Sequence, residues 1–528
     1  MKKKVLASVL TASMLLGALT ACGSDSTSAD TTASTSSSGG EVTYEEVTVE
    51  GSDITYHKAT DMTTDEITLT YFNFDQQEIT DYLAQRFMEI YPNITVVNSY
   101  ENVATYDDTL LTMVSNQQTP DVIMYSDADF ALSNMLLADI TDYYEADPET
   151  DELASTVNDA GLGCFGTSRR FAVPVKFFPG IMYIDRNVLN TLNIEVPDQS
   201  WTWSEMIQLI KDATVLDSPD GMAYYGCGVY NRLDSYYGIA SSQDIVGEFG
   251  FDGTDFDLSA WAVGEQEFSD LKLGGYVAPS TETQEMEDWA GDWEAWCGAT
   301  GHVALFTEAF WTYQGTWATE AYDQYNLDIV PYVVPAVSDE DASADHHTIA
   351  TIDFGGVTTS CQYPREAYEL LKFMSFGVDG WNTRIEAYND ESLTNSSGLA
   401  LKYDVMPAPI TTNSEVWEAY IDMYCADMDE EHKALWENYF ASCMQPIPYG
   451  WTAIAGYWNF CDQYFNKIGI HDLVDGGSAK AADYVEEATK QANYYHATAM
   501  LTYFGESGYD VLSDEEVATY TQLQADNS

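Results

Sequence analysis

Residues 67–136 alternate between strand-like and helix-like hydrophobic patterns. Residues 67–72 have the apolar–polar alternation of a strand, residues 79–90 carry apolar side chains at helical spacing, and residues 94–97 have the pattern of a second strand. A helix over residues 106–115 and an almost wholly apolar strand over residues 121–125 follow. This order predicts a parallel α/β sheet, and ligands of such sheets bind beyond the carboxyl ends of the strands.

Length and charge narrow the class of protein further. The chain has 528 residues, too many for one ordinary core, which predicts two or more lobes. It carries 20 Lys and Arg against 86 Asp and Glu, a formal net charge of −66. Because Lys and Arg bind phosphate backbones, this balance excludes nonspecific binding of nucleic acid as the main activity. It also argues against adsorption to anionic lipid.

The N-terminus has the pattern of an export signal. Lys2, Lys3 and Lys4 precede an apolar stretch over residues 5–19, which at about 15 residues is short for a membrane span. It ends in Leu-Thr-Ala-Cys at residues 19–22, which resembles a bacterial lipobox. We therefore expect residues 1–21 to be a lipoprotein signal peptide, Cys22 to carry the lipid (diacylglycerol and palmitate), and the Ser/Thr-rich residues 22–40 to form a flexible tether on the outer face of the cell membrane.

The remaining composition points to no cofactor and no metal. The seven cysteines after Cys22 are scattered without a CxxC pair, so most are expected to be small core residues. The histidines have no zinc spacing, the acidic runs lack the order of a calcium loop, and there is no phosphate-binding P-loop.

A series of short motifs resembles one family. Residues 91–97 (YPNITVV), the run LLADITDYYEAD at 136–147, and the helix beginning at Pro364 occur in the order seen in family 1 of the extracellular solute-binding proteins of ABC importers, the maltose-binding-protein type. Thr202 and Glu205 belong to a further similar segment, and they have the spacing of a capping box at a helix start.

The resemblance implies a type II periplasmic-binding-protein fold, with two α/β lobes, each a mostly parallel sheet flanked by helices, and a ligand cleft between them. One lobe would comprise residues 41–176 and 337–412, the other residues 177–336 and 413–528. It also implies a monomeric binding protein without catalytic residues, which captures a solute and delivers it to membrane permease subunits.

The candidate ligand-binding residues follow from sugar chemistry. Flat aromatic faces bind the C–H patches of pyranose rings, and carboxylates or amides bind the hydroxyls. Few Arg clusters are present, which favours a neutral, hydroxyl-rich solute, an oligosaccharide, over an anionic one. The candidates are Asn73, Asp75, Asp127, Phe178, Trp293, Trp311, Asp353 and Trp451, with Glu308 as a further choice.

Alternatives stay open at this level. A surface-anchored glycoside hydrolase needs a pair of catalytic carboxylates. The chain has 86 acidic residues, so its sequence is compatible with such a pair but does not identify one. A binding lipoprotein for a polyamine or a peptide, or a sensor or adhesion protein of the same fold, is also compatible with the sequence. Two expectations concern helices later in the chain: Trp289, Trp293 and Trp296 form one helical stripe, and the last helix runs roughly over residues 479–500.

Overall fold

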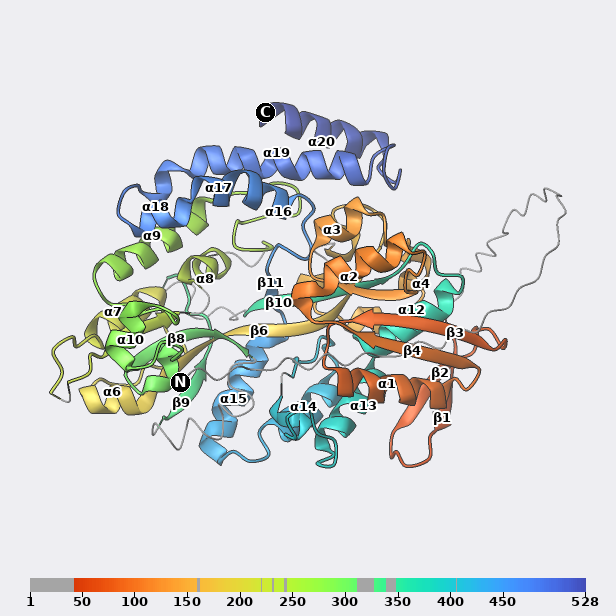
Figure 1. The fold of residues 1–528 in the computed structure, drawn as a ribbon, viewed down its shortest axis with the longest axis horizontal. Coiled ribbons are helices and arrows are strands. Elements are labelled where there is room, and N and C mark those ends of the chain that lie inside the picture. The colour runs from red at the N-terminus through yellow and green to blue at the C-terminus, as the bar shows by residue number, and fades with distance from the viewer. Residues whose placement is uncertain are drawn as a thin grey trace, which may run out of the picture. The chain divides into compact units, whose positions relative to one another are not determined.

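The computed structural model describes residues 42–158, 162–219, 221–229, 232–241, 245–310, 327–338, 348–404 and 406–528. The predicted signal peptide, Cys22 and the tether lie outside these residues, as does Trp311. Gly40–Ser528 groups as one compact unit. Within its described part, β1 and β2 pair with each other, and nine further strands form one mixed sheet (Figure 1).

The strands and helices alternate through most of this unit. The strands are β1 Tyr44–Thr48, β2 Thr55–Ala59, β3 Ile67–Asn73, β4 Ile94–Tyr100, β5 Val122–Tyr125, β6 Val173–Asp185, β7 Tyr225–Val229, β8 Val303–Ala309, β9 Ile329–Tyr332, β10 Ile349–Val357 and β11 Ile447–Pro448. The N-terminal helices are α1 Gln77–Ile90, α2 Val103–Ser115, α3 Ala128–Ser133, α4 Thr141–Glu145, α5 Ser155–Asn158, α6 Arg186–Leu192, α7 Trp203–Asp212, α8 Leu233–Ala240, α9 Ser259–Leu273 and α10 Gln284–Ala290. The C-terminal helices are α12 Pro364–Met374, α13 Val378–Asn389, α14 Ser414–Tyr424, α15 Glu430–Cys443, α16 Tyr457–Phe460, α17 Asn466–Ile468, α18 Ile470–Asp475, α19 Val485–Tyr503 and α20 Asp514–Asp526.

The first part of the sheet confirms the predicted strand–helix alternation. β3 pairs in parallel with both β4 and β5. α1 buries Ile79, Leu83, Phe87 and Ile90, the residues that defined its predicted apolar face. The three strands therefore end at one edge, where Asn73 is the last residue of β3 and Asp127 follows β5.

β6 joins the two parts of the sheet. Residues 173–179 pair antiparallel with β10, and residues 180–185 pair antiparallel with β8 and β9. β10 also runs antiparallel to β5, whereas β7 is parallel to β8. The sheet is thus mixed, because β6 runs antiparallel to β8, β9 and β10, and β10 runs antiparallel to β5 but parallel to β11.

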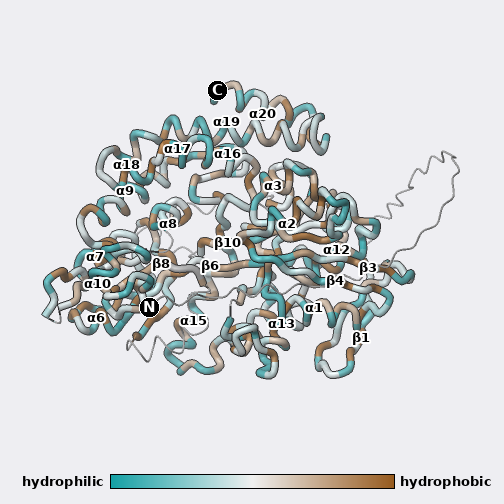
Figure 2. Tube along the Cα trace, in the orientation of Figure 1, coloured by the Kyte–Doolittle hydropathy of each residue, from teal (hydrophilic) through white to brown (hydrophobic). Residues whose placement is uncertain are grey.

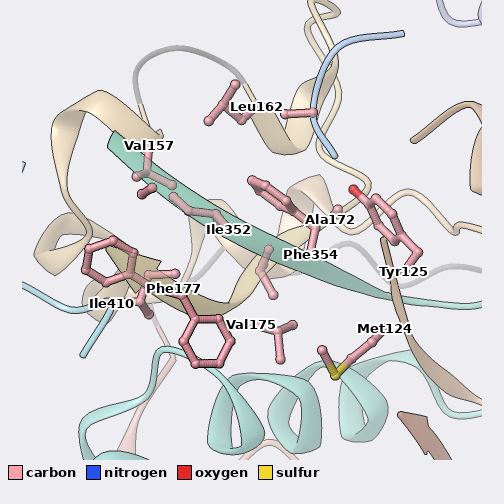
Figure 3. Close-up of a cluster of buried hydrophobic side chains, with 14 of the residues drawn as sticks. Met124, Tyr125, Val157, Leu162, Ala172, Val175, Phe177, Ile352, Phe354 and Ile410 are labelled. Carbon is pink, nitrogen blue, oxygen red and sulfur yellow. The ribbon is translucent and has the colours of Figure 1, made fainter. Parts of the chain in front are cut away.

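Two groups of buried apolar side chains pack around β6, one at each end of the strand. Val175 and Phe177 of β6 pack with Ile352 and Phe354 of β10 in the larger core, as Figure 3 shows. A second core surrounds the other end of β6, with Met182 among its buried residues. The surrounding helices alternate hydrophilic and hydrophobic residues along the chain (Figure 2), as amphipathic helices that cover a core do.

Local signals in the sequence are confirmed at several positions. Thr202 and Glu205 form the predicted capping box of α7, with each side chain bonded to the other residue's backbone N–H. α12 begins at Pro364 with proline in its first turn. Cys227, Cys443 and Cys461 are buried thiols, in agreement with the expectation of core cysteines.

Two local expectations are wrong. The tryptophan stripe does not exist as a helix face, because α10 ends at Ala290 and Gly291 adopts a left-handed conformation before Trp293. α19 is not the last helix either, since α20 follows it from a Ser513 capping box.

α19 contacts two distant parts of the chain. Phe504, just beyond its end, packs against Phe165 and Phe171, whereas Asn493 in its middle accepts a hydrogen bond from the backbone N–H of Phe256. Residues 165 and 171 belong to the first predicted lobe and residue 256 to the second. α19 and the residue that follows it therefore connect segments that the sequence assigns to different lobes.

Candidate functional site

Lys176 lies at the centre of a polar cluster on one face of β6 and β10. Lys176 is opposite Asp353, and Phe178 is opposite Thr351. Because side chains alternate along a strand and opposite residues share a face, these four side chains lie on the same side of the sheet. Their neighbours Val175 and Phe177 lie on the other side, in the core.

Two carboxylates and two cations form this cluster. The Nζ atom of Lys176 is 3.9 Å from an oxygen of Asp75 and 3.7 Å from an oxygen of Asp353. An Nη atom of Arg384 in α13 lies 3.0 Å from the other oxygen of Asp75. All four side chains are buried. Burial of opposite charges in contact is tolerable, whereas a single buried charge is not, which explains why acids and bases occur here together.

The two carboxylates differ in their proton affinity. Burial opposes the charge on Asp75, but Arg384 and Lys176 outweigh it and lower the pKa of Asp75. Burial, its largest cause, raises the pKa of Asp353 to about 6; the negative charge of Asp75 adds to the rise and Lys176 opposes it. Its partners therefore keep Asp75 ionised. Asp353 gains or loses its proton at a pH closer to neutrality than Asp75 does.

Aromatic rings flank the cluster. The Nζ atom of Lys176 is 4.9 Å from the ring centre of Phe74 and 5.3 Å from that of Phe178, within range of a cation–π contact. Phe178, a candidate from the sequence, is thus placed beside two other candidates, Asp75 and Asp353.

Trp451 lies at the same end of the sheet. Its carbonyl accepts a hydrogen bond from the N–H of Ala128 at 3.5 Å, next to Asp127. The hydroxyl of the following residue, Thr452, donates to the carbonyl of Ile352, next to Asp353. The Trp451 ring stacks on Tyr449, with 4.3 Å between ring centres and 17° between planes. Trp451 thereby links the Asp127 and Asp353 candidates.

Asp127 and Asn73 have local partners. Asp127 is the N-cap of α3 and accepts a hydrogen bond from the N–H of Phe130. The amide nitrogen of Asn73 donates to Asn98 and to the carbonyl of Ser99, while its oxygen accepts from the N–H of Asp75. Both residues shape the ends of the strands, and Asn73 orients the loop that carries Asp75.

The remaining candidates are not joined to this cluster. Trp293 follows α10, is 45% exposed, and its carbonyl accepts from the N–H of Glu282; none of its described contacts involves Lys176 or its partners. The backbone of Glu308 pairs with Ile181 in the sheet, and its side chain lies outside the described residues. Trp311 lies outside them entirely.

Sequence reasoning missed Lys176, Arg384 and Phe74. Lys176 had a detectable signal, because it is the single charged residue in the apolar run from Val173 to Phe178, and Lys is almost never buried without a partner. Arg384 had none, since its contact with Asp75 joins residues far apart in the chain. Elsewhere in the described chain, no helix combines the length and apolarity that crossing a membrane requires.

Solved structures share this fold at low sequence identity. An ABC substrate-binding protein of Listeria monocytogenes in complex with cycloalternan is 17% identical, with a TM-score of 0.54, over 81% of this chain and 98% of that one. The GacH receptor of Streptomyces glaucescens, studied unliganded and with acarbose, is 16% identical, with a TM-score of 0.52, over 82% of this chain and 98% of that one. The sugar-binding protein MalE of Xanthomonas citri is 11% identical, with a TM-score of 0.57, over 83% of this chain and 100% of that one.

These likenesses show that the chain has the two-lobed type II fold of periplasmic binding proteins. A comparison with curated protein sequences found no match. The model of the family described as bacterial extracellular solute-binding protein matches residues 73–375, more than half of the 528 residues. The matched segment includes β4 to β10 and also Asp75, Lys176 and Asp353. The chain belongs to the family of bacterial extracellular solute-binding proteins.

Proposed function

We propose that this solute-binding protein is the lipid-anchored, extracellular capture component of an ABC importer and that its solute is an oligosaccharide. Its family consists of extracellular binding proteins, and structures of the same fold include complexes with cycloalternan and acarbose. The captured solute would pass to membrane permease subunits.

The observation that carries the sugar assignment is the Lys176 cluster. Asp75, Asp353 and Lys176 supply hydrogen-bond acceptors and a donor for hydroxyl groups, and Phe74 and Phe178 supply apolar ring faces beside them. Sugar recognition combines these two kinds of surface. The cations are already paired with carboxylates, so the cluster offers no surplus positive charge to an anionic solute.

Capture would occur by closure of two lobes. The proposed lobes comprise residues 41–176 with 337–412 and residues 177–336 with 413–528, and β6 runs from one to the other as a single strand. The site residues Asp75 and Lys176 then belong to one lobe, and Phe178 and Trp451 to the other. A solute that contacts both sets favours the closed state by the difference between its affinities for the closed and open states.

The anchor is proposed from the sequence at residues 19–22. Replacement of Cys22 by Ala removes the thiol that would carry the lipid. We expect the Cys22→Ala protein to appear in the soluble fraction of cells, while the unaltered protein stays with the membrane. Equal membrane association of both proteins would refute lipidation at Cys22.

A cationic solute is the second candidate, favoured by a group of acids around the start of α3. Burial, followed by repulsion from Asp127 and Asp108, raises the pKa of Asp107 to about 6. Burial and Asp127 also raise the pKa of Asp129 to about 6, against a hydrogen bond from the N–H of Gly456. A polyamine would relieve this repulsion, and Trp451 lies beside the same segment.

A thermal-shift screen separates these candidates. Oligosaccharides, polyamines and peptides are each added to the protein, and a ligand at 100 times its Kd stabilises the native state by about 2.7 kcal/mol. A rise in Tm with one class of glycan, without product after overnight incubation, supports oligosaccharide capture. A rise with polyamines alone refutes the sugar assignment, and glycan cleavage would identify a hydrolase.

A further inference from the structure

A second polar cluster, separate from the Lys176 site, lies where three helices meet. Asp234 comes from α8, Glu265 from α9 and His471 from α18, and these helices lie side by side (Figure 1). One carboxylate oxygen of each acid and a ring nitrogen of His471 lie within 4.8 Å of one another. Asp234 is 3% exposed and Glu265 is fully buried.

Each acid uses one oxygen for a hydrogen bond. The other oxygen has only an ion-pair neighbour, Nε of Arg232 at 3.4 Å for Asp234 and Nδ1 of His471 at 3.0 Å for Glu265. Oδ2 of Asp234 accepts a hydrogen bond from the indole N–H of Trp261 at 3.0 Å, and Oε2 of Glu265 accepts from Arg232 at 2.6 Å. Oδ1 of Asp234 and Oε1 of Glu265 are buried and make no hydrogen bond. A buried carboxylate oxygen without a hydrogen bond is costly, so these two atoms require an explanation.

The contact between Glu265 and His471 does not explain the two oxygens that lack a hydrogen bond. Nδ1 of His471 is 3.0 Å from Oε1 of Glu265, yet neither atom is in hydrogen-bonding geometry. Two ligand atoms that share a tetrahedral ion with bonds of about 2.1 Å lie about 3.4 Å apart without pointing at each other. The observed 3.0 Å is shorter than this separation, so binding of an ion would move the two atoms slightly apart.

The charges around the cluster leave room for a cation. Arg232 pairs with Glu265 and Asp475, and Lys272 also pairs with Asp475. Oδ1 of Asp234 is 3.4 Å from Nε of Arg232. The carboxylates of Asp234, Glu265 and Asp475 therefore face only two basic side chains, those of Arg232 and Lys272. With a neutral imidazole, one negative charge is uncompensated.

The surroundings resemble the outer shell of metal sites. Ligand carboxylates in such sites are themselves held by hydrogen bonds, as Trp261 and Arg232 hold these two. Aromatic rings enclose the imidazole, with centroids 5.0 Å away for Phe465 and 6.1 Å away for Trp261. The side chain of His471 is nevertheless 33% exposed, which gives an ion a path of entry.

We propose that Asp234, Glu265 and His471 bind a divalent first-row transition ion, such as Zn²⁺, which ties α18 to α8 and α9. Mixed carboxylate and imidazole ligands favour such ions over Ca²⁺, which prefers six to eight oxygens. The sequence did not indicate this site, because its ligands come from three separate helices and have no motif spacing. The proposal does not depend on the identity of the solute.

Calorimetric titration of the full chain with Zn²⁺ tests the proposal. The protein is treated with a chelator, freed of any histidine tag and titrated with Zn²⁺ or Ca²⁺. We expect one Zn²⁺ per chain, little binding of Ca²⁺, and a rise in Tm on addition of Zn²⁺. Co²⁺ should give the visible absorption of a low-coordinate site, which reports on the ligands directly.

Two variants locate the ion. His471→Phe keeps a ring in the aromatic enclosure and Asp234→Asn keeps the acceptor for Trp261, and each should weaken Zn²⁺ binding by at least about 10-fold. His57→Phe is the matched control, because His57 also contacts a carboxylate, that of Asp379 at 3.2 Å, but is exposed and outside the cluster. Circular dichroism verifies that each variant is folded.

Either of two results would overturn the proposal. One is no stoichiometric binding of Zn²⁺ or Co²⁺ by the unaltered chain, in which case a proton on His471 supplies the missing charge. The other is binding that His471→Phe and Asp234→Asn leave unchanged, in which case the ion binds elsewhere.

Discussion

The buried pair of Asp75 and Arg384 offers a quantitative test of the Lys176 cluster. Each side chain is 3% exposed, and the two charged groups are 3.0 Å apart. Removing one partner of such a pair leaves an uncompensated buried charge, at a cost of about 3–5 kcal/mol. Arg384→Met keeps much of the apolar stem and removes the charge. Because Lys176 remains 3.9 Å from Asp75, we expect a loss near the lower end, about 3 kcal/mol.

The loss should depend on pH with a defined sign. The folded protein lowers the pKa of Asp75, so this carboxylate contributes stability above its unfolded pKa of about 3.9, and the contribution is lost as the pH falls through the folded pKa. In Arg384→Met much of that lowering disappears. The stability difference between the two proteins should therefore be full near pH 7 and shrink below about pH 4.

Urea unfolding followed by tryptophan fluorescence measures the difference. Lys490→Met is the control, because Lys490 pairs with Glu486 on the surface, and we expect no measurable change in its unfolding midpoint. The double variant Asp75→Asn with Arg384→Met should recover part of the loss, since no charge is then left unpaired. A loss in Arg384→Met no larger than in the control would refute the argument that buried charge pairing holds this cluster together.

Three further predictions concern single residues. Trp451→Leu removes the half-buried ring that stacks on Tyr449 and should weaken oligosaccharide binding about 10-fold in calorimetry; unchanged affinity would place the sugar elsewhere. Burial lowers the pKa of His496 to about 4, so the unfolded chain binds a proton more tightly and stability falls as the pH drops from about 6.5 towards 4. His496→Gln should remove about 2 kcal/mol of the loss between pH 7 and pH 5, and equal pH profiles of the two proteins would contradict this. Thr202→Ala removes the capping box of α7 and should cost about 1 kcal/mol in urea unfolding, whereas Ser at the same position should preserve the cap.

Local physics made much of the first lobe predictable. Period-two alternation predicted β3, helical spacing predicted α1 and an apolar run predicted β5, since the buried residues of each element are neighbours in the sequence. Capping residues predicted the start of α7 in the same way. The tryptophan stripe failed because Gly291 ends α10, and a helix end of this kind outweighs the spacing of the residues beyond it.

The sites depended on contacts that no local pattern contains. The position of Asp75 was predictable, because it follows β3 at the edge where parallel strands expose their carboxyl ends. Asp353 was expected at a strand end as well, but it lies in the middle of β10, which runs antiparallel to β5 and β6. Their partners Lys176 and Arg384 were not predictable, since the pairing depends on the register of β6 against β10 and on how α13 packs. The sequence by itself determined the class of fold and the kinds of polar side chain near the strand ends. It also predicted the export signal. Only the tertiary structure decided which charges meet, because a buried charge is tolerated only where the fold brings an opposite charge within a few ångströms.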